Sequence, residues 1–185
     1  VIQPESLTRT RVRTLDWGVA SGILRQINTS RGGLPKNAVA RPVMVGKLGI
    51  EGDDHRNKKV HGGPNKAVLM ASAEFIDGLA ADGFPICWGA LGENLTVSGL
   101  DPHLWRAGQR WRIGDEVVLE LTQLRRPCSN LDVYGEEIKA ELYDLQCKAG
   151  DVNAPHWAHG GIYARVTREG LIAVGAPVVL ESDVA

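Results

Sequence analysis

The residue with the clearest potential for chemistry is Cys128, in the sequence Leu-Arg-Arg-Pro-Cys-Ser of residues 124–129. Two arginines precede it, and a helix is expected to begin near Asn130. Neighbouring cations and a helix N-terminus both favour the thiolate form of a cysteine. A thiolate attacks electrophiles or coordinates soft metal ions. The alternative is an inert buried cysteine that only packs.

A second candidate is Lys36, which follows the paired glycines Gly32 and Gly33. Glycine-rich loops present backbone N–H groups to anions, and a lysine adds a point charge. The pattern of a nucleotide-binding P-loop is missing. Taken alone, Lys36 is therefore better explained as a solvated side chain.

Polar turns supply the remaining candidates, which are Asp53, His61, Glu93 and Asn94. His61 is followed by two glycines, which allow a close backbone approach to a ligand or to another strand. Glu93 and Asn94 lie in a turn, where capping of backbone groups explains them locally. The acidic and histidine residues between 53 and 61 do not have the spacing of a standard zinc site.

These residues need elements that hold them together, and the hydrophobic pattern predicts mainly strands. Helices are expected from Ser72 to near Gly83, with Ser72 as N-cap, and over 130–148. Strands are expected over 18–27, 42–50, 66–71 and 111–124, with one between two turns in the region 90–100 and two more between 161 and 180. The alternation of Val117, Leu119 and Leu121 makes the 111–124 strand the clearest of them.

The composition agrees with a strand-rich domain. Glycine supplies 22 of the 185 residues and falls at turn positions between short apolar runs, as in barrels and sandwiches. We expect one domain over 18–180, an N-terminal arm over 1–17 and a C-terminal tail over 181–185. The net charge of −1 argues against a nucleic-acid or anionic-membrane binder. No apolar stretch reaches the ~18 residues of a membrane span.

The three cysteines are an odd number without a C-x-x-C pair, which disfavours a disulfide scaffold or a four-cysteine zinc site. Cys87 and Cys147 are expected to be packing residues. The first residues do not resemble a signal peptide, so the default expectation is a cytoplasmic protein.

Taken in order, these motifs resemble the MOSC domain, named for the C-terminal domain of molybdenum cofactor sulfurase. The resemblance is specific to the stand-alone bacterial subgroup linked to resistance against 6-hydroxylaminopurine, and it covers about 18–180. It departs from the family pattern at Leu124 and Ala176, which are not proposed ligands. The motifs that carry it are Gly-Gly-Leu-Pro-Lys (32–36), His-Gly-Gly (61–63), Gly-Glu-Asn-Leu (92–95), Arg-Pro-Cys (126–128) and Gly-Ile-Tyr-Ala-Arg (161–165).

The resemblance implies a mainly β, barrel-like single domain with two or three helices. It also implies a pterin molybdenum cofactor with Cys128 as the metal ligand. Lys36, His61 and Arg126 are then expected around the cofactor or substrate. The expected supports of that pocket are Asp53, Glu93 and Asn94. Pyridoxal phosphate belongs to a separate desulfurase domain in full-length sulfurases, and no site for it is expected here.

The leading hypothesis is therefore a molybdenum-dependent oxidoreductase that reduces N-hydroxylated bases or related N–O compounds, with His61 or Lys36 as proton donor. The sequence has no flavin, haem or iron–sulfur motif, so a separate reductase is the expected electron donor. One alternative is a carrier that holds a persulfide on Cys128 or passes on the cofactor. Another is a non-enzymatic ligand-binding barrel.

Overall fold

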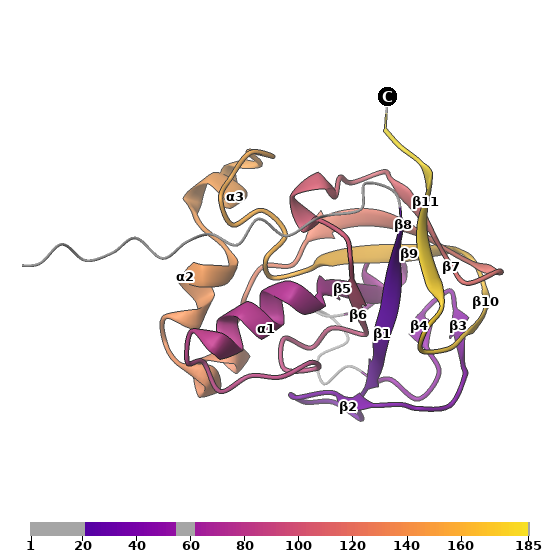
Figure 1. The fold of residues 1–185 in the computed structure, drawn as a ribbon, viewed down its shortest axis with the longest axis horizontal. Coiled ribbons are helices and arrows are strands. Elements are labelled where there is room, and N and C mark those ends of the chain that lie inside the picture. Colours follow the sequence, from indigo (N-terminus) through magenta and orange to yellow (C-terminus); the bar gives the residue numbers. More distant parts are fainter. Residues whose placement is uncertain (1–20, 55–61, 185) are drawn as a thin grey trace, which may run out of the picture.

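The computed structural model describes residues 21–54 and 62–184, and strands dominate it (Figure 1). The predicted N-terminal arm over 1–17 lies outside the described residues. In chain order the strands are β1 (Ser21–Thr29), β2 (Asn37–Ala38), β3 (Val43–Gly46), β4 (Gly49–Ile50), β5 (Val68–Ser72), β6 (Leu95–Ser98), β7 (Arg110–Ile113), β8 (Val117–Leu124), β9 (Ile162–Arg168), β10 (Gly170–Ile172) and β11 (Pro177–Ser182). The helices are α1 (Ala73–Ala81), α2 (Ile138–Leu142) and α3 (Leu145–Ala149), with the short 3-10 helices η1 (Pro64–Lys66), η2 (Pro102–Leu104) and η3 (Ser129–Tyr134).

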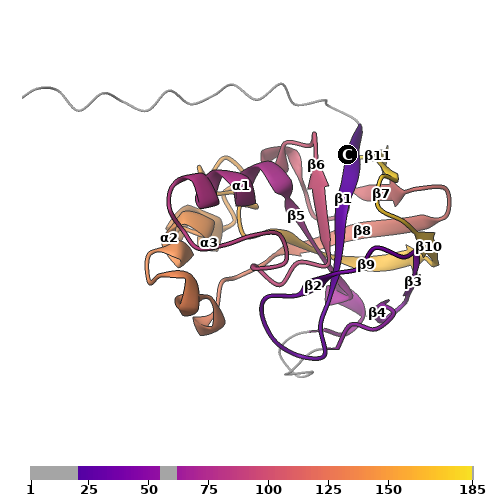
Figure 2. The ribbon, with the colours of Figure 1, turned by 60° about the horizontal axis from the view of Figure 1, so that its bottom comes forward.

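Seven strands form a closed barrel in the order β1, β11, β7, β8, β9, β5 and β6, and β6 pairs with β1 again. An odd number of strands cannot alternate in direction all the way around a barrel. The exception is the β5–β6 pair, which is parallel. Parallel neighbours need a long crossover connection, and α1 lies in that connection. β2 pairs antiparallel with the end of β1, while β10, β3 and β4 form a small separate sheet (Figure 2).

Alternation along the strands explains how the barrel fills its interior. In β8, Leu119 and Leu121 are buried, while Glu120 between them pairs with Arg165 on the outside, 2.5 Å away. In β1, Gly22 and Leu24 alternate in the same way, and an irregularity between Leu24 and Gln26 shifts the pattern so that Ile27 is buried as well. The expected mainly β, barrel-like single domain is thus confirmed, and its three α-helices agree with the two or three expected.

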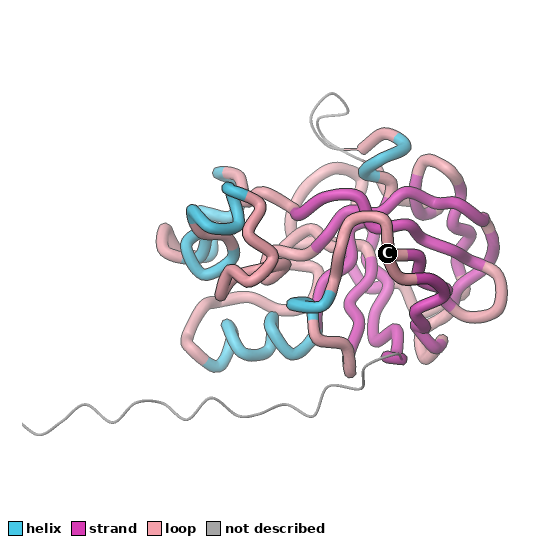
Figure 3. The backbone as a smooth tube through the Cα atoms, turned by 90° about the horizontal axis from the view of Figure 1, so that it is seen from above, coloured by secondary structure: helices cyan, strands magenta, loops and turns pink. Residues whose placement is uncertain are grey.

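The α-helices gather on one side of the barrel (Figures 1 and 3). α1 begins where the sequence predicts, because the Ser72 hydroxyl caps the helix by accepting from the backbone N–H of Phe75. It ends at Ala81, with Asp82 as the C-cap, close to the expected end near Gly83. A second apolar cluster, separate from the barrel core, packs Ile76 of α1 against Leu131 and Ile138.

The predicted single helix over 130–148 is wrong. The chain there forms η3, α2 and α3, because Gly135 takes a φ of +118° and Tyr143 is extended. Ile138 and Leu142 are buried, but Leu145 is 80% exposed. The apolar residues therefore have helical spacing without sharing one helical face.

Three predicted strand regions also need correction. A turn at Gly114 divides the region 111–124 into the β7–β8 hairpin. The region 42–50 is likewise the β3–β4 hairpin. The region 161–180 holds three strands, because β10 leaves the barrel to pair with β3. β11 extends to Ser182, into the expected tail. Among the described residues, no helix has the length and apolarity needed to cross a membrane.

Candidate functional site

A cavity of about 330 Å³ lies where the helical side of the molecule meets the barrel. Lys36, Asn94 and Cys128, which are far apart in the sequence, all line it. Other lining residues come from β5, from η3 and from the start of β9. Closure of the barrel therefore brings together residues that the sequence singled out separately.

Cys128 lies in the segment that leaves β8 toward η3. The backbone N–H of Arg125 donates to the Gly161 carbonyl at 3.0 Å, which anchors this segment to the start of β9. Cys128 is partly exposed and lines the cavity. The other two cysteines do not line it: Cys147 is buried in the core as expected, whereas Cys87 is exposed and is not a packing residue.

The expected long helix behind Cys128 is absent from the described chain. Cys128 immediately precedes η3, which has six residues and 3-10 geometry. The dipole of so short an element is small compared with that of a full α-helix. The cationic surroundings of the thiol therefore come from side chains.

Lys36 is not solvated, because it forms a buried ion pair. Its Nζ lies 2.6 Å from Oδ2 of Asp53, and the two side chains are 6% and 3% exposed. Asn94 donates to the same carboxylate oxygen at 2.8 Å, and the Ser30 N–H donates to the other at 2.9 Å. Burial lowers the pKa of Lys36, while the adjacent Asp53 carboxylate opposes that shift by stabilising the ammonium. Asp53 thus contacts Lys36 directly and is itself held by Asn94 and the Ser30 backbone.

Asn94 fixes this network to the barrel. Its Oδ1 accepts from the Leu69 N–H at 3.1 Å, and its Nδ2 also donates to the Asn28 carbonyl at 3.3 Å. Since all these groups are buried, the amide cannot rotate without leaving backbone groups unpaired.

Glu93 is 0% exposed and does not line the cavity, although its chain neighbours Gly92 and Asn94 do. Its Oε1 accepts from the Gly89 N–H and, at 3.0 Å, from the Thr96 hydroxyl. Its Oε2 has no hydrogen-bond partner among the described residues. Burial raises the pKa of Glu93, and the hydrogen bonds from Gly89 and Thr96 oppose that shift. The carboxyl holds the Gly89 turn, whose carbonyl in turn accepts from the Lys36 N–H at 2.9 Å.

The two arginines before Cys128 have opposite placements. Arg126, the one predicted from the sequence, is exposed and does not line the cavity. Arg125 is 4% exposed and lines it. Consecutive side chains in an extended segment point to opposite sides, so only one of them can face inward.

His61 lies outside the described residues, and the structure therefore does not place it. Within 21–54 and 62–184, no group of three or more histidine, cysteine or acidic side chains is arranged to hold a metal ion. Sequence reasoning missed Arg125 and Tyr163 as lining residues. Tyr163 and Arg165 are two residues apart and share one face of β9, so strand alternation alone does not indicate that Tyr163 is buried while Arg165 is exposed.

The sequence is similar to a known protein family and to two bacterial proteins. A model of the MOSC domain matches residues 57–179. YflK of Bacillus subtilis is 32% identical over 153 residues, covering 81% of this chain and 63% of that protein. YiiM of Escherichia coli is also 32% identical, over 157 residues, covering 82% and 65%. This chain thus spans just under two thirds of these curated relatives.

Solved structures share the fold. The crystal structure of YiiM from Geobacillus stearothermophilus is similar with a TM-score of 0.64 and 29% identity, over 87% of this chain and 75% of that one. A more distant relative is a Gibberella moniliformis protein named as a reductase. It is 29% identical over 126 residues, which cover 60% of this chain and 22% of that protein.

Proposed function

Because this chain belongs to the MOSC domain family, we propose that its cavity binds the pterin molybdenum cofactor, with the Cys128 thiolate as the protein ligand of the metal. The observation that carries the proposal is the presence of one partly exposed cysteine in a cavity that also contains buried cations. A soft thiolate suits a metal that already has sulfur ligands.

The residues present are compatible with such a group. The cofactor brings a soft metal and an anionic phosphate, and the cavity offers a thiol and the Arg125 guanidinium. Arg125 Nη1 is buried and has no hydrogen-bond acceptor among the described residues. A buried donor without a partner is costly, so a bound anion would relieve an existing deficit.

The proposed reaction is the reduction of an N-hydroxylated base to the amine, in which two electrons and two protons convert the N–OH group into N–H and water. When bound, the cofactor supplies the electron pair and accepts the oxygen. The chain's own contribution is to hold a proton near the leaving oxygen. Lys36 and His61 are the proposed donors, and the Lys36 ammonium is held at the cavity by Asp53. The reductase name of one distant relative supports this class of reaction.

The electrons are proposed to come from a separate reductase. The sequence carries no flavin, haem or iron–sulfur motif that could supply the reducing equivalents. Reduction of an N-hydroxylated base in the presence of the loaded protein and a flavin-dependent reductase, but not with either alone, is the expected result.

The decisive experiment measures molybdenum and pterin in protein from a host that makes the cofactor, for the wild type, Cys128→Ala and Cys87→Ala. Near-stoichiometric molybdenum is expected in the wild type and in Cys87→Ala, whose thiol lies outside the cavity lining. Cys128→Ala should lose it. Folded wild-type protein without molybdenum or pterin, but with sulfane sulfur on Cys128, would favour the carrier function instead.

A further inference from the structure

The cavity contains two buried cationic side chains, and they differ in how their charge is balanced. Lys36 forms an ion pair with Asp53 at 2.6 Å, and the Asn94 side chain donates a hydrogen bond to the same carboxylate. All three side chains are almost fully buried. The positive charge of Lys36 is therefore matched within the protein, and an incoming anion would have to compete with a carboxylate already in contact.

Arg125 has no carboxylate in contact with it, among the described residues, to balance its charge. Its Nη2 donates to the Leu91 carbonyl at 3.1 Å, while Nη1 is buried without an acceptor in the described part of the chain. Arg125 forms no ion pair with a described carboxylate. Burial lowers the pKa of Arg125, and the phenol of Tyr163, the thiol of Cys128 and the carboxyl of Glu93 oppose that shift in this order. Tyr163 also opposes it through a side-chain hydrogen bond to the guanidinium. Burial raises the pKa of Glu93, which favours its neutral form.

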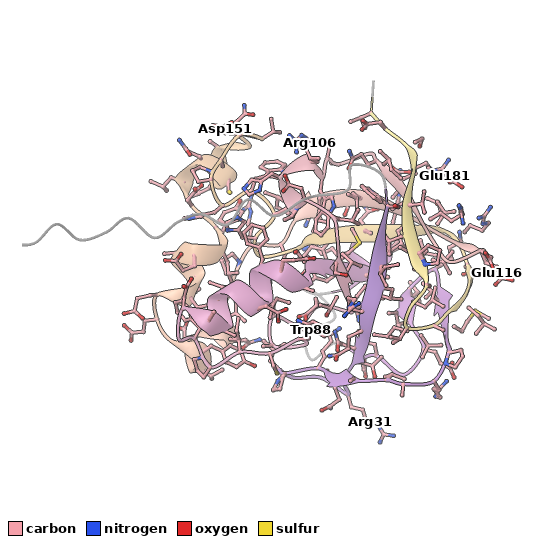
Figure 4. All side chains as sticks on the ribbon, in the orientation of Figure 1. Arg31, Trp88, Arg106, Glu116, Asp151 and Glu181 are labelled. Carbon is pink, nitrogen blue, oxygen red and sulfur yellow. The ribbon has the colours of Figure 1, made fainter. Side chains whose placement is uncertain are left out.

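The other charged groups near the cavity do not replace Arg125. Arg126 is exposed and outside the lining, and Arg31 extends from the loop after β1 into solvent (Figure 4). Asp54 also lines the cavity, and as an acidic residue it adds no positive charge there. The unmatched positive charge of the cavity thus resides on Arg125.

We propose that Arg125 is the anion receptor of this cavity, binding an oxygen of a phosphate group through Nη1, and that Lys36 is not an anion-binding residue. Binding of phosphate at Arg125 does not depend on the proposed function, but the identity of the molecule that carries the phosphate does. That source is either the cofactor or a nucleotide substrate. A guanidinium is suited to this role because its planar donors match phosphate oxygens and it stays charged when buried.

The test uses the full chain, free of cofactor, and inorganic phosphate as the probe in isothermal titration calorimetry. Arg125→Gln should raise the dissociation constant for phosphate at least tenfold, which is the change expected from the loss of one charge-assisted hydrogen bond. The matched control Arg126→Gln removes the same charge one residue away, and should change the affinity less than twofold. Equal losses in the two variants would overturn the proposal, because they would indicate a diffuse electrostatic effect.

A wild-type protein that binds no phosphate at about 20 mM, above the millimolar dissociation constant expected for a single such contact, would also overturn it. If Arg125→Gln does not fold, Arg125→Lys keeps the charge but removes the planar fork. It should still weaken binding severalfold while its circular dichroism matches that of the wild type. Unchanged affinity in a folded Arg125→Lys would contradict binding through Nη1.

Two further arms identify the source of the phosphate. Loss of pterin and molybdenum from Arg125→Gln but not from Arg126→Gln assigns the phosphate to the cofactor. Retained molybdenum with lost inhibition by a nucleoside monophosphate assigns it to the substrate. Arg125-dependent phosphate binding in a protein that never takes up molybdenum would leave this inference standing while overturning the proposed function.

Discussion

At Lys36 the energetic consequence of burial can be tested directly. Asp53→Asn leaves the ammonium buried without a counter-charge, which should destabilise the protein by about 3–5 kcal/mol. The double variant Asp53→Asn with Lys36→Met removes both charges and should recover most of that loss, since apolar replacement of a buried pair is often neutral. Urea denaturation of the three proteins measures the difference. A single variant as stable as the wild type would contradict a buried, charged Lys36.

His159 predicts a dependence of stability on pH. Its ring packs on Phe75 with centroids 3.9 Å apart and lies 5.2 Å from the ring of His103. Burial, together with the nearby His103 and His156, lowers the pKa of His159 to about 4. The unfolded chain, with an ordinary histidine pKa of about 6.5, then binds more protons. Stability is therefore fully present above that value and is lost as the pH falls toward 4.

The expected loss attributable to His159 is about 1 kcal/mol between pH 7 and pH 5.5. His159→Asn removes the titrating group, so its stability should fall less than that of the wild type over this interval. Denaturant unfolding at both pH values measures the two slopes. Parallel slopes would show that His159 does not titrate differently in the folded state.

At the scale of elements, the start of β9 is where backbone packing limits the sequence. Gly161 has a φ of +88°, and a Cβ there would lie 2.7 Å from the Met70 carbonyl oxygen in β5. Gly161→Ala should therefore cost about 2–3 kcal/mol, from the backbone conformation and the contact together. Because the Gly161 carbonyl accepts from the Arg125 N–H, this variant should also weaken phosphate binding.

Gly175 is the matched control, with a φ of +90° and no atom within 4 Å of an added Cβ. Gly175→Ala has only the conformational cost, about 1 kcal/mol. Thermal unfolding of both variants separates the two contributions. Equal destabilisation would mean that the contact with Met70 adds nothing.

At the scale of the whole molecule, barrel closure depends on β11. This strand pairs with β1 on one side and β7 on the other, and its Val178 is fully buried. A chain that ends after Ala176 loses both ladders and exposes two strand edges. We expect a loss of at least about 5 kcal/mol, comparable with the entire stability of many domains, and no cooperative unfolding transition.

A chain that ends after Ser182 keeps the whole of β11 and is the control. It loses the Gln109–Asp183 hydrogen bond of 3.0 Å, which is worth about 1 kcal/mol. Amide dispersion in a two-dimensional NMR spectrum distinguishes the two truncations. A well-dispersed spectrum from the shorter chain would show that the barrel does not need its closing strand.

Local pattern was enough to predict much of this protein. The alternation of Val117, Leu119 and Leu121 and the capping residue Ser72 depend on neighbours in the chain, so the strand and the start of α1 were predictable. The motif order likewise indicated the family and therefore the barrel. Cys128 could be identified as a candidate by type and context, whereas Lys36 became a candidate only through the resemblance to the family.

Tertiary structure alone decided how those residues combine. The 130–148 region has helical spacing, but its breaks at Gly135 and Tyr143 depend on which apolar side chains find a core to enter. Similarly, both arginines before Cys128 carry the same charge and propensity. Only the packing of the segment after β8 against β9 buries Arg125 and leaves Arg126 in solvent. Burial and charge balance are properties of the assembled barrel, because they depend on residues from distant strands.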